Sequence, residues 1–371
     1  MTSPTAEQTA LAAAWIDFCD VLREAGETIL RAEAPQQPDV CANGFLHLTQ
    51  LLSLGIDFFC SNASGEFPEF DAVVTPRRTW ALDNPDSVYH RAPLSGDHSY
   101  RITGQRGTSR LLLFDVNEGI TGSGRTRRQH GHLTSDDMQI EEDGTFEIII
   151  SSERPPKGNW LPLDRVLSPF DFGLIVRQYF ADRDREIPAT YSIECLDGPD
   201  VPGPTSPDHV GRGLHETARF VRDSVAYWAW VTDELAKAPN QLLDADPQSS
   251  AHSGANPDNA YRGGMYQLDE GEALVIKVQP APDAAFWNFY ISDYWWININ
   301  QRHHRMNINS SSATLEADGS LLLVVSDRDH GFGNHVDTGG SRQGVMLLRM
   351  TYPRSAPSIE CSVRSADEII V

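Results

Sequence analysis

The sequence contains no run of about 18 apolar residues, the least that a helix needs to cross a bilayer, so we expect no membrane-spanning segment. Its N-terminal stretch lacks the basic region and the long apolar core of a secretory signal peptide. Basic residues are scarce, because 30 Lys and Arg stand against 52 Asp and Glu and the net charge is −22. An acidic chain of this kind repels phosphate backbones, which argues against nucleic acid and anionic membranes as partners.

Cysteine is also scarce. The five cysteines are scattered and form no CxxC pair, which argues against a structural zinc site and favours free thiols in a reducing cytoplasm. Walker A, GxGxxG, GxSxG and HExxH motifs are absent. Their absence removes the commonest nucleotide-binding, hydrolase and zinc-protease functions, and no organic cofactor is implied.

The sequence has enough apolar residues to form a packed core. Apolar residues make up 40% of its 371 positions, enough for two ordinary domains. Apolar residues at three- and four-residue steps predict helices over about 5–34, 38–60 and 208–238, the last with Asp208 as its N-cap. Elsewhere Gly-rich turns separate many short strand-like runs, which is typical of an antiparallel sandwich or barrel.

The chain also repeats itself. DGTFEIIISSERPPKGNW at residues 143–160 aligns without a gap with DGSLLLVVSDRDHGFGNH at residues 318–335. Three further matches keep the same order: NPDSVY from Asn84 with NPDNAY from Asn256, Arg177 with Arg349, and SIEC at residues 192–195 with residues 358–361. Matches in a fixed order are typical of a duplicated domain. We therefore predict a mainly β protein with added α-helices, built from two tandem antiparallel β-sandwich domains related by internal duplication.

Composition divides the chain into four segments, because LDGPDVPGPTSP reads as a linker before the third predicted helix. The predicted segments are an N-terminal helical segment at 1–66, a first β-sandwich repeat at 67–200, a linker and helix at 201–254, and a second repeat at 255–371.

Several elements resemble a family of bacterial proteins, the domain of unknown function 1214. The resembling residues are WNFYISD at Trp287–Asp293, the turns at Asp143 and Asp318, NWLP at Asn159–Pro162 and the strand around Arg177. In the second copy His335 replaces Trp160, and Val336 and Asp337 replace Leu161 and Pro162. The resemblance covers most of residues 80–365. It implies two jelly-roll-like β domains and no settled reaction, so no catalytic residue is carried over.

Features that both copies share are better candidates for supporting the fold than for one active site. These candidates are Asn84, Asp86, Tyr89, Asn256, Asp258 and Tyr261 of the NPDxxY motifs, together with Asn159, Trp160 and Arg177. Arg177 and Arg349 lie within apolar strands. A buried arginine needs a partner, so we expect a carboxylate such as an Asp of a DG or NPD turn, with anion binding as the alternative.

Features that differ between the copies point to function instead. Histidine and carboxylate side chains gather near the loops of the second copy, at His303, His304, His330, His335, Asp327, Asp329 and Asp337. Imidazole and carboxylate together serve as base and orienter or hold a transition metal. We nominate His303, His335 and Asp337 as catalytic, and His330, His335 and Asp337 as ligands of a divalent metal. Ordinary solvated loop histidines are the alternative, and adjacent His303 and His304 would point to opposite faces of a strand.

Two further stretches carry candidate side chains. Tyr294, Trp295 and Trp296 follow an aromatic strand and are expected, with Arg349, to contact a ligand, core packing being the alternative. RTRRQHGHLTSD at residues 125–136 imitates a cupin metal signature through His130, His132 and Asp136. Its arginines oppose a cation, so a mobile basic loop is the simpler interpretation.

We therefore expect a small-molecule-binding protein or an enzyme of hydrolase or lyase type, with its pocket in the second repeat. The expected lining is Trp295, His303, His335, Asp337 and Arg349, and the expected ligand is carbohydrate-like or polycyclic. A non-catalytic scaffold of paired jelly rolls is the alternative, and a homo-oligomer is compatible with either.

Overall fold

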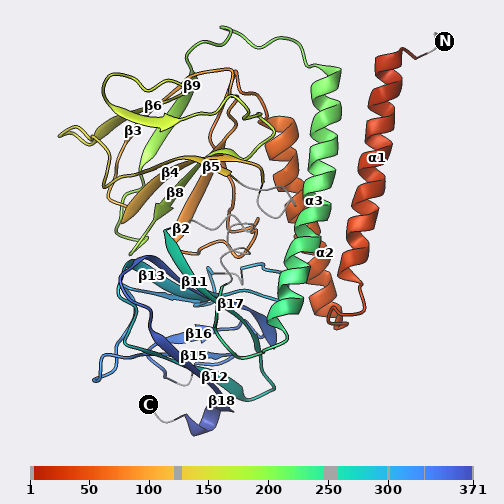
Figure 1. The fold of residues 1–371 in the computed structure, drawn as a ribbon. Coiled ribbons are helices and arrows are strands. Elements are labelled where there is room, and N and C mark those ends of the chain that lie inside the picture. The colour runs from red at the N-terminus through yellow and green to blue at the C-terminus, as the bar shows by residue number, and fades with distance from the viewer. Residues whose placement is uncertain (1–3, 121–127, 246–257, 299–300, 330, 370–371) are drawn as a thin grey trace. The chain divides into compact units, whose positions relative to one another are not determined.

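The computed structural model describes residues 4–120, 128–245, 258–298, 301–329 and 331–369. The chain forms two compact units (Figure 1). The first joins Met1–Arg78 to Ser87–Tyr227, and the second joins Thr79–Asp86 to Trp228–Val371. These boundaries differ from the predicted segments. The N-terminal helices belong to the same unit as the first β-sandwich, and Thr79–Asp86, which ends with the first NPD sequence, belongs to the second unit.

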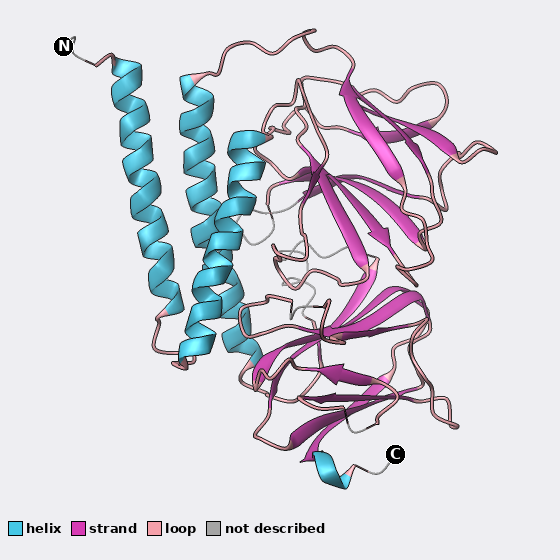
Figure 2. Cartoon of the chain, turned by 180° about the vertical axis from the view of Figure 1, so that it is seen from behind, coloured by secondary structure: helices cyan, strands magenta, loops and turns pink. Residues whose placement is uncertain are grey.

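Three α-helices form where the apolar periodicity predicts them (Figure 2). They are α1 (Ala6–Ile29), α2 (Pro38–Ile56), which continues into a π-helical turn, η1 (Asp57–Ser61), and α3 (Pro207–Leu235). Thr5 and Gln8 form a capping box at the start of α1. The predicted N-cap Asp208 is wrong by two positions, because Ser206 accepts from the backbone N–H groups of His209 and Val210. None of the described helices is long and apolar enough to cross a bilayer.

The first unit contains a β-sandwich of one five-stranded and one four-stranded sheet. Its strands are β1 (Asp71–Ala72), β2 (Ser87–Ala92), β3 (Tyr100–Gln105), β4 (Leu111–Glu118), β5 (Arg128–Thr134), β6 (Thr145–Ser151), β7 (Asn159–Pro162), β8 (Gly173–Tyr179) and β9 (Thr190–Cys195). The sheet orders are β1-β2-β8-β4-β5 and β7-β6-β3-β9. Alternate side chains of β4, β8, β3 and β6 fill the space between the sheets, among them Leu112, Phe114, Val176, Ile102 and Ile148.

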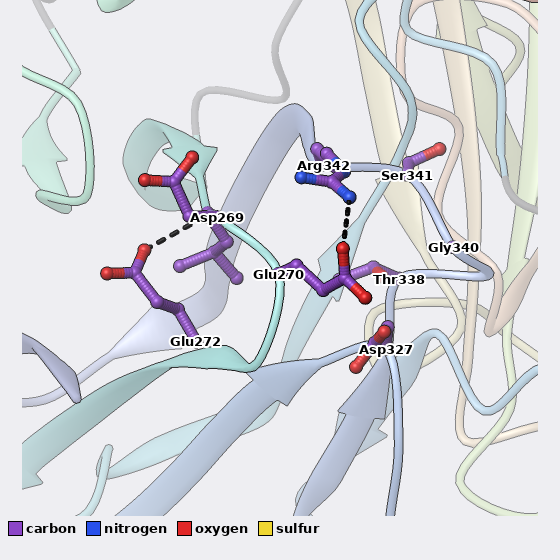
Figure 3. Close-up of a pocket in the computed structure, with 9 residues that line it drawn as sticks. Asp269, Glu270, Glu272, Asp327, Thr338, Gly340, Ser341 and Arg342 are labelled. Atoms are coloured by element: carbon purple, nitrogen blue, oxygen red, sulfur yellow. Dashed lines mark hydrogen bonds and ion pairs between the residues drawn. The ribbon is translucent and has the colours of Figure 1, made fainter. Parts of the chain in front are cut away.

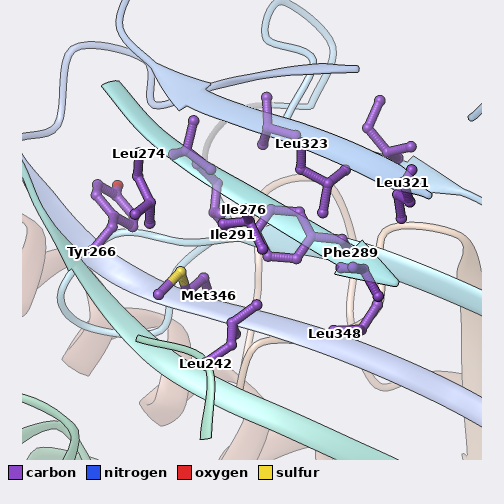
Figure 4. Close-up of a cluster of buried hydrophobic side chains, with 14 of the residues drawn as sticks. Leu242, Tyr266, Leu274, Ile276, Phe289, Ile291, Leu321, Leu323, Met346 and Leu348 are labelled. Carbon is purple, nitrogen blue, oxygen red and sulfur yellow. The ribbon is translucent and has the colours of Figure 1, made fainter. Parts of the chain in front are cut away.

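The second unit repeats this arrangement. Its strands are β10 (Leu243–Asp244), β11 (Asn259–Gln267), β12 (Glu272–Gln279), β13 (Ala284–Ile291), β14 (Asn307–Asn309), β15 (Leu321–Ser326), β16 (His335–Asp337), β17 (Gln343–Pro353) and β18 (Ser358–Ser365), followed by a short 3-10 helix, η2 (Ala366–Glu368). The sheet orders are β10-β11-β17-β13-β14 and β16-β15-β12-β18. Leu274 and Leu323 pack with Phe289, Met346 and other core side chains of this unit (Figure 4).

Strand for strand, the two sheet orders are equivalent, which confirms the predicted duplication and the two β-sandwiches. The sandwiches are not wholly antiparallel. In each, one short edge strand pairs in parallel with its neighbour, β7 with β6 and β16 with β15. These two parallel edges begin at the Gly-Asn ends of the repeated block.

The repeated polar residues of the 18-residue block support these edges. Asp143 accepts hydrogen bonds from the backbone and hydroxyl of Thr145, and Asp318 does the same for Ser320. Both turns place glycine at a positive φ, 85° for Gly144 and 77° for Gly319, a conformation that L side chains rarely adopt. The shared turn therefore depends on the shared Asp-Gly pair.

The two repeated asparagines make matching contacts. Asn159 donates to the carbonyls of Gln139 and Glu147, both at 2.8 Å, and accepts from the Gln139 N–H at 2.7 Å. Asn334 donates to the carbonyls of Thr314 and Leu322 and accepts from the Thr314 N–H at 2.8 Å. Each amide thus ties the parallel edge strand to a loop as well as to its neighbouring strand.

A fully buried arginine ties the N-terminal helices to the first sandwich. The Arg91 guanidinium, on β2, donates to five main-chain carbonyls at 3.0–3.2 Å: those of Phe58 and Asn62, and of Pro169, Asp171 and Phe172. It also lies 4.8 Å from the centre of the Phe58 ring. Because the first two acceptors belong to η1 and its end, this contact explains why the helices share a unit with the sandwich.

Candidate functional site

His335 does not open into a pocket in the second unit. Its side chain is buried on β16, where Nε2 lies 3.0 Å from Ser326 Oγ and 3.3 Å from the Ser326 carbonyl oxygen. Trp160, at the equivalent position of the first copy, donates its ring N–H to Ser151 Oγ and the Ser151 carbonyl, both at 3.2 Å. A carbonyl contact requires a donor, so His335 carries its proton on Nε2. The histidine reproduces the structural task of the tryptophan.

The residue that meets Asp337 is His304 rather than the predicted His303. His304 Nδ1 lies 2.8 Å from Asp337 Oδ2, while Asp337 Oδ1 accepts from the Gly339 N–H at 2.7 Å. His303 is exposed in the preceding turn. Burial, opposed in part by the nearby Asp329 and Asp337, lowers the pKa of His335. His330 lies outside the described residues, so the predicted metal-binding set stays a prediction. Of the predicted catalytic residues, His303 is exposed whereas His335 is buried.

The aromatic residues predicted to contact a ligand lie in the interior of the second unit. Tyr294, Trp295 and Trp296 are 4%, 3% and 7% exposed. Trp296 donates to the Thr232 hydroxyl at 2.8 Å, and Tyr294 packs edge-to-face on Trp295 at 5.0 Å. These rings serve core packing rather than a surface open to a ligand.

Arg349 also takes a position other than the predicted one. Its guanidinium lies 5.4 Å from the Tyr261 ring and 5.5 Å from the Tyr290 ring, on the face of the five-stranded sheet that points away from the sandwich core. In the second copy, the buried Arg349 guanidinium therefore makes cation–π contacts with two tyrosine rings.

The second unit does contain a cavity of about 160 Å³, but at a different place (Figure 3). Its lining residues are Leu268, Asp269, Glu270, Glu272, Asp327, Thr338, Gly340, Ser341 and Arg342. Arg342 pairs with Glu270 at 3.1 Å, and Glu272 accepts from the Asp269 N–H at 2.8 Å. None of the five predicted lining residues borders this cavity.

The two NPDxxY motifs have different partners. In the first, Asp86 is buried and accepts from the side-chain amides of Asn288 and Asn307, both at 2.9 Å, while Asn84 accepts from the Asp86 N–H. In the second, Asp258 accepts from the Tyr352 hydroxyl at 3.3 Å. Tyr261 accepts from Asn259, Tyr89 lies on β2, and Asn256 is outside the described residues.

A buried group of charged residues lies on the outer face of the five-stranded sheet of the first sandwich. Since Leu112, Phe114 and Val116 of β4 point into the core, Asp115 and Asn117 point to the opposite face. Asp115 lies directly across from His132 on β5, and Arg177 lies on the neighbouring strand β8. The predicted carboxylate partner of Arg177 is thus found, but it is Asp115 and not an Asp of a DG or NPD turn.

Asp115 is the centre of this group, which we call the Asp115 cluster: Asp115, Gln129, His132 and Arg177. One carboxylate oxygen lies 2.6 Å from His132 Nδ1 and accepts from Gln129 Nε2 at 2.7 Å, and the other accepts from Arg177. The Asp115 side chain is 1% exposed, whereas 28% of the His132 side chain is exposed. A buried, arginine-paired carboxylate beneath a partly exposed imidazole can orient that imidazole for proton transfer.

A second imidazole–carboxylate pair lies on the same two strands, β5 and β4. His130 Nε2 lies 3.0 Å from Glu118 Oε2, and its Nδ1 lies 3.8 Å from Asp164. The segment predicted as a mobile basic loop therefore includes a strand, β5, whose histidines meet carboxylates of β4 and a neighbouring loop. Asp136, the predicted third member of a cupin-like set, is not part of either pair.

The Asp115 cluster is specific to the first copy. Matching Arg177 to Arg349 through the sheet registers places Tyr290 at the position of Asp115 and Asn307 at that of His132. The fold is thus built once without the carboxylate and the imidazole. A sequence signal for Asp115 did exist, since it is the one charged residue within the apolar strand LLLFDV.

Comparison with known proteins places the chain in a family. A model described as "protein of unknown function (DUF1214)" matches residues 89–183 and 263–355, one segment in each sandwich. The chain belongs to this family. The two DUF1214 matches agree with the duplication seen in the strand order and confirm the resemblance found in the sequence.

Solved structures extend the comparison, whereas a search of curated proteins gives no match. A crystal structure of an uncharacterised protein from Burkholderia cenocepacia is 32% identical, with a TM-score of 0.92 over 97% of this chain and 99% of that one. A Vibrio parahaemolyticus protein is 12% identical, with a TM-score of 0.48 over 85% of this chain and 97% of that one. The DUF1214 match and these neighbours carry no stated activity.

Proposed function

We propose that this DUF1214 protein binds a small polar molecule at the Asp115 cluster and acts on it by acid–base chemistry of the hydrolase or lyase type. This proposal moves the predicted site from the second repeat to the first. The observation that carries it is the buried Asp115 carboxylate, held by Arg177 on one side and by the partly exposed His132 on the other.

Each residue of the cluster has a chemical role in this proposal. Donation from His132 Nδ1–H to Asp115 fixes the tautomer in which Nε2 carries the lone pair, so Nε2 is the proton acceptor. Arg177 keeps Asp115 in its anionic form, which stabilises the imidazolium formed when His132 takes a proton.

The polar side chains around His132 favour a hydroxyl-bearing ligand. The Gln129 carboxamide and the His132 imidazole together offer both donors and acceptors to hydroxyl groups. The carbohydrate-like class expected from the sequence is therefore retained. The polycyclic class loses its support, because the aromatic residues meant to stack on such rings are buried in the second unit.

A screen of monosaccharides and sugar acids by ligand-observed NMR on the full chain tests this function. His132→Gln removes the proton acceptor but keeps a polar side chain, and His303→Gln, at the exposed histidine of the second unit, is the matched control. We expect ligands that bind the wild type and His303→Gln but not His132→Gln. Equal binding by all three proteins would reject the Asp115 cluster as the site.

An assembly role is a second proposal, favoured by exposed apolar side chains on the N-terminal helices. Trp15 and Ile16 of α1 are 55% and 60% exposed, and Phe45 and Leu46 of α2 are 44% and 51% exposed. Such side chains suit a homo-oligomeric contact. Light scattering at high protein concentration tests this role, and a strictly monomeric chain would argue against it.

We also propose a cytoplasmic location. All five cysteines are free thiols, as a reducing compartment keeps them. Fractionation of cells producing the untagged protein would test this, and recovery outside the cytoplasm would contradict it.

A further inference from the structure

The four-stranded sheet of the first sandwich brings three side chains with different donor atoms together at the end of its edge strand β9. The register pairs Tyr100 of β3 with Cys195, and the next backbone bond runs from the Leu196 N–H to the Ser99 carbonyl at 2.8 Å. One step further, His98 faces Asp197. Residues two apart on a strand share a face, so Cys195 lies on the same side as Asp197.

The separations among these atoms are close to those of metal ligands. His98 Nδ1 lies 3.0 Å from Asp197 Oδ1, and Cys195 Sγ lies 3.6 Å from the same oxygen. With bond lengths of about 2.0–2.3 Å, ligand atoms around tetrahedral zinc stand about 3.3–3.6 Å apart, so the sulfur–oxygen separation fits and the hydrogen-bonded nitrogen and oxygen would move apart by about 0.3 Å. Across the described parts of the chain, this is the one group of three His, Cys, Asp or Glu residues whose ligand atoms all lie within 4.8 Å of one another.

The neighbouring residues orient the Asp197 carboxylate and leave the three side chains accessible to an ion. Asp197 accepts two bonds from the Ser99 N–H, at 3.1 and 3.2 Å, which orient its carboxylate. Gly198 leaves room beside the sulfur, since a Cβ there would lie 3.0 Å from Cys195 Sγ. The His98 side chain is 19% exposed and that of Asp197 is 49% exposed, so an ion can reach them from solvent.

The charges also suit a cation. A Cys195 thiolate would lie 3.6 Å from the Asp197 carboxylate, and two neighbouring negative charges repel each other. A divalent ion would supply the positive charge that such a pair requires.

The second copy shows that the fold does not need this group. Cys361 is the counterpart of Cys195, and it pairs with Ile276 on β12. In the same register, Leu274 stands where the first copy has His98, and Val363 stands where it has Asp197. Both apolar replacements sit in an intact sandwich, so the polar set of the first copy has a task other than building the sheet.

We propose that His98, Cys195 and Asp197 form a three-ligand site for a divalent ion of the zinc class, with water completing a tetrahedron. Thiolate and imidazole favour such borderline-soft ions over magnesium or calcium. Binding replaces the proton on Cys195 Sγ with a sulfur–metal bond and releases that proton to the buffer. The site is separate from the Asp115 cluster and does not depend on the function proposed there.

Titration of the reduced, metal-stripped full chain tests the site. We expect one Zn²⁺ to bind with release of about one proton, measured by calorimetry in buffers of different ionisation enthalpy. Co²⁺ should give a thiolate charge-transfer band in the near ultraviolet. Cys195→Ser should abolish that band and weaken Zn²⁺ binding by more than about tenfold, since even outer partners of metal ligands are worth about 10- to 100-fold.

Two further variants make the test specific. Asp197→Asn keeps the size of the side chain and one acceptor oxygen but should also weaken binding, whereas Cys361→Ser, at the equivalent cysteine of the second copy, should change neither the band nor the affinity. Circular dichroism confirms that each variant is folded. Absence of stoichiometric Zn²⁺ binding by the wild type, or a cobalt band that survives Cys195→Ser, would overturn the proposal.

Discussion

The contact between Arg91 and five carbonyls makes a sharp prediction about the first unit. Lysine offers three donors, so Arg91→Lys leaves at least two of the five carbonyls without the donor that they have in the wild type. An unsatisfied buried acceptor costs about 1–3 kcal/mol, so this substitution should lower the free energy of unfolding by about 2–6 kcal/mol. Arg91→Met leaves all five carbonyls without that donor and should destabilise the unit further.

Urea unfolding followed by far-ultraviolet circular dichroism measures this loss. Arg101→Lys is the matched control, because Arg101 is 41% exposed and pairs with Glu147 and Glu194 on the surface. A surface pair contributes about 1 kcal/mol or less, so the control should shift the transition only slightly. An Arg91→Lys shift no larger than that of Arg101→Lys would refute the reasoning.

Three further predictions concern other buried polar groups. Arg177→Met should destabilise the chain by about 3–5 kcal/mol in urea unfolding, because it leaves Asp115 buried without its cation, and adding Asp115→Leu should restore part of that loss. Asn334→Ala should cost about 2–4 kcal/mol by the same measurement, because two carbonyls and one N–H lose their partner. Burial lowers the pKa of His47 from 6.5 to about 4. Between these two pH values His47 is protonated in the unfolded chain and neutral in the folded chain. Stability should therefore fall by about 2 kcal/mol between pH 7 and pH 5, and His47→Leu should remove this component.

The fold could be predicted because its signals are local. Asp-Gly turns, alternating strands and the Gly-Asn ends occur twice, and each forms contacts mainly within its own segment. Strands of mixed polarity are the ones that hydropathy does not predict. β5 reads RQHGHLT, has few apolar residues and lies at a sheet edge, so hydropathy alone gives it the appearance of a loop.

The candidate sites could not be predicted because they depend on the pairing of distant strands. The sequence points to His132 but predicts the nearby Asp136 as its partner, whereas the partner is Asp115, across the sheet on β4. His98 and Asp197 are 99 positions apart and meet only through the β3–β9 register. The difference between Trp160 and His335 suggests a change of function, but the contact is the same in both copies. Each ring directs one N–H to the equivalent serine, Ser151 or Ser326, so the change of residue type preserves the contact.

The most direct test of the Asp115 cluster is histidine side-chain NMR on the full chain, with ¹⁵N-labelled histidine and the ligands found in the screen. His132→Gln identifies the resonances of His132, and His303→Gln identifies those of the exposed histidine in the second unit. We predict that added ligand shifts the His132 ring resonances and leaves those of His303 unchanged. Shifts at His303, with His132 unaffected, would contradict the placement of the site in the first sandwich.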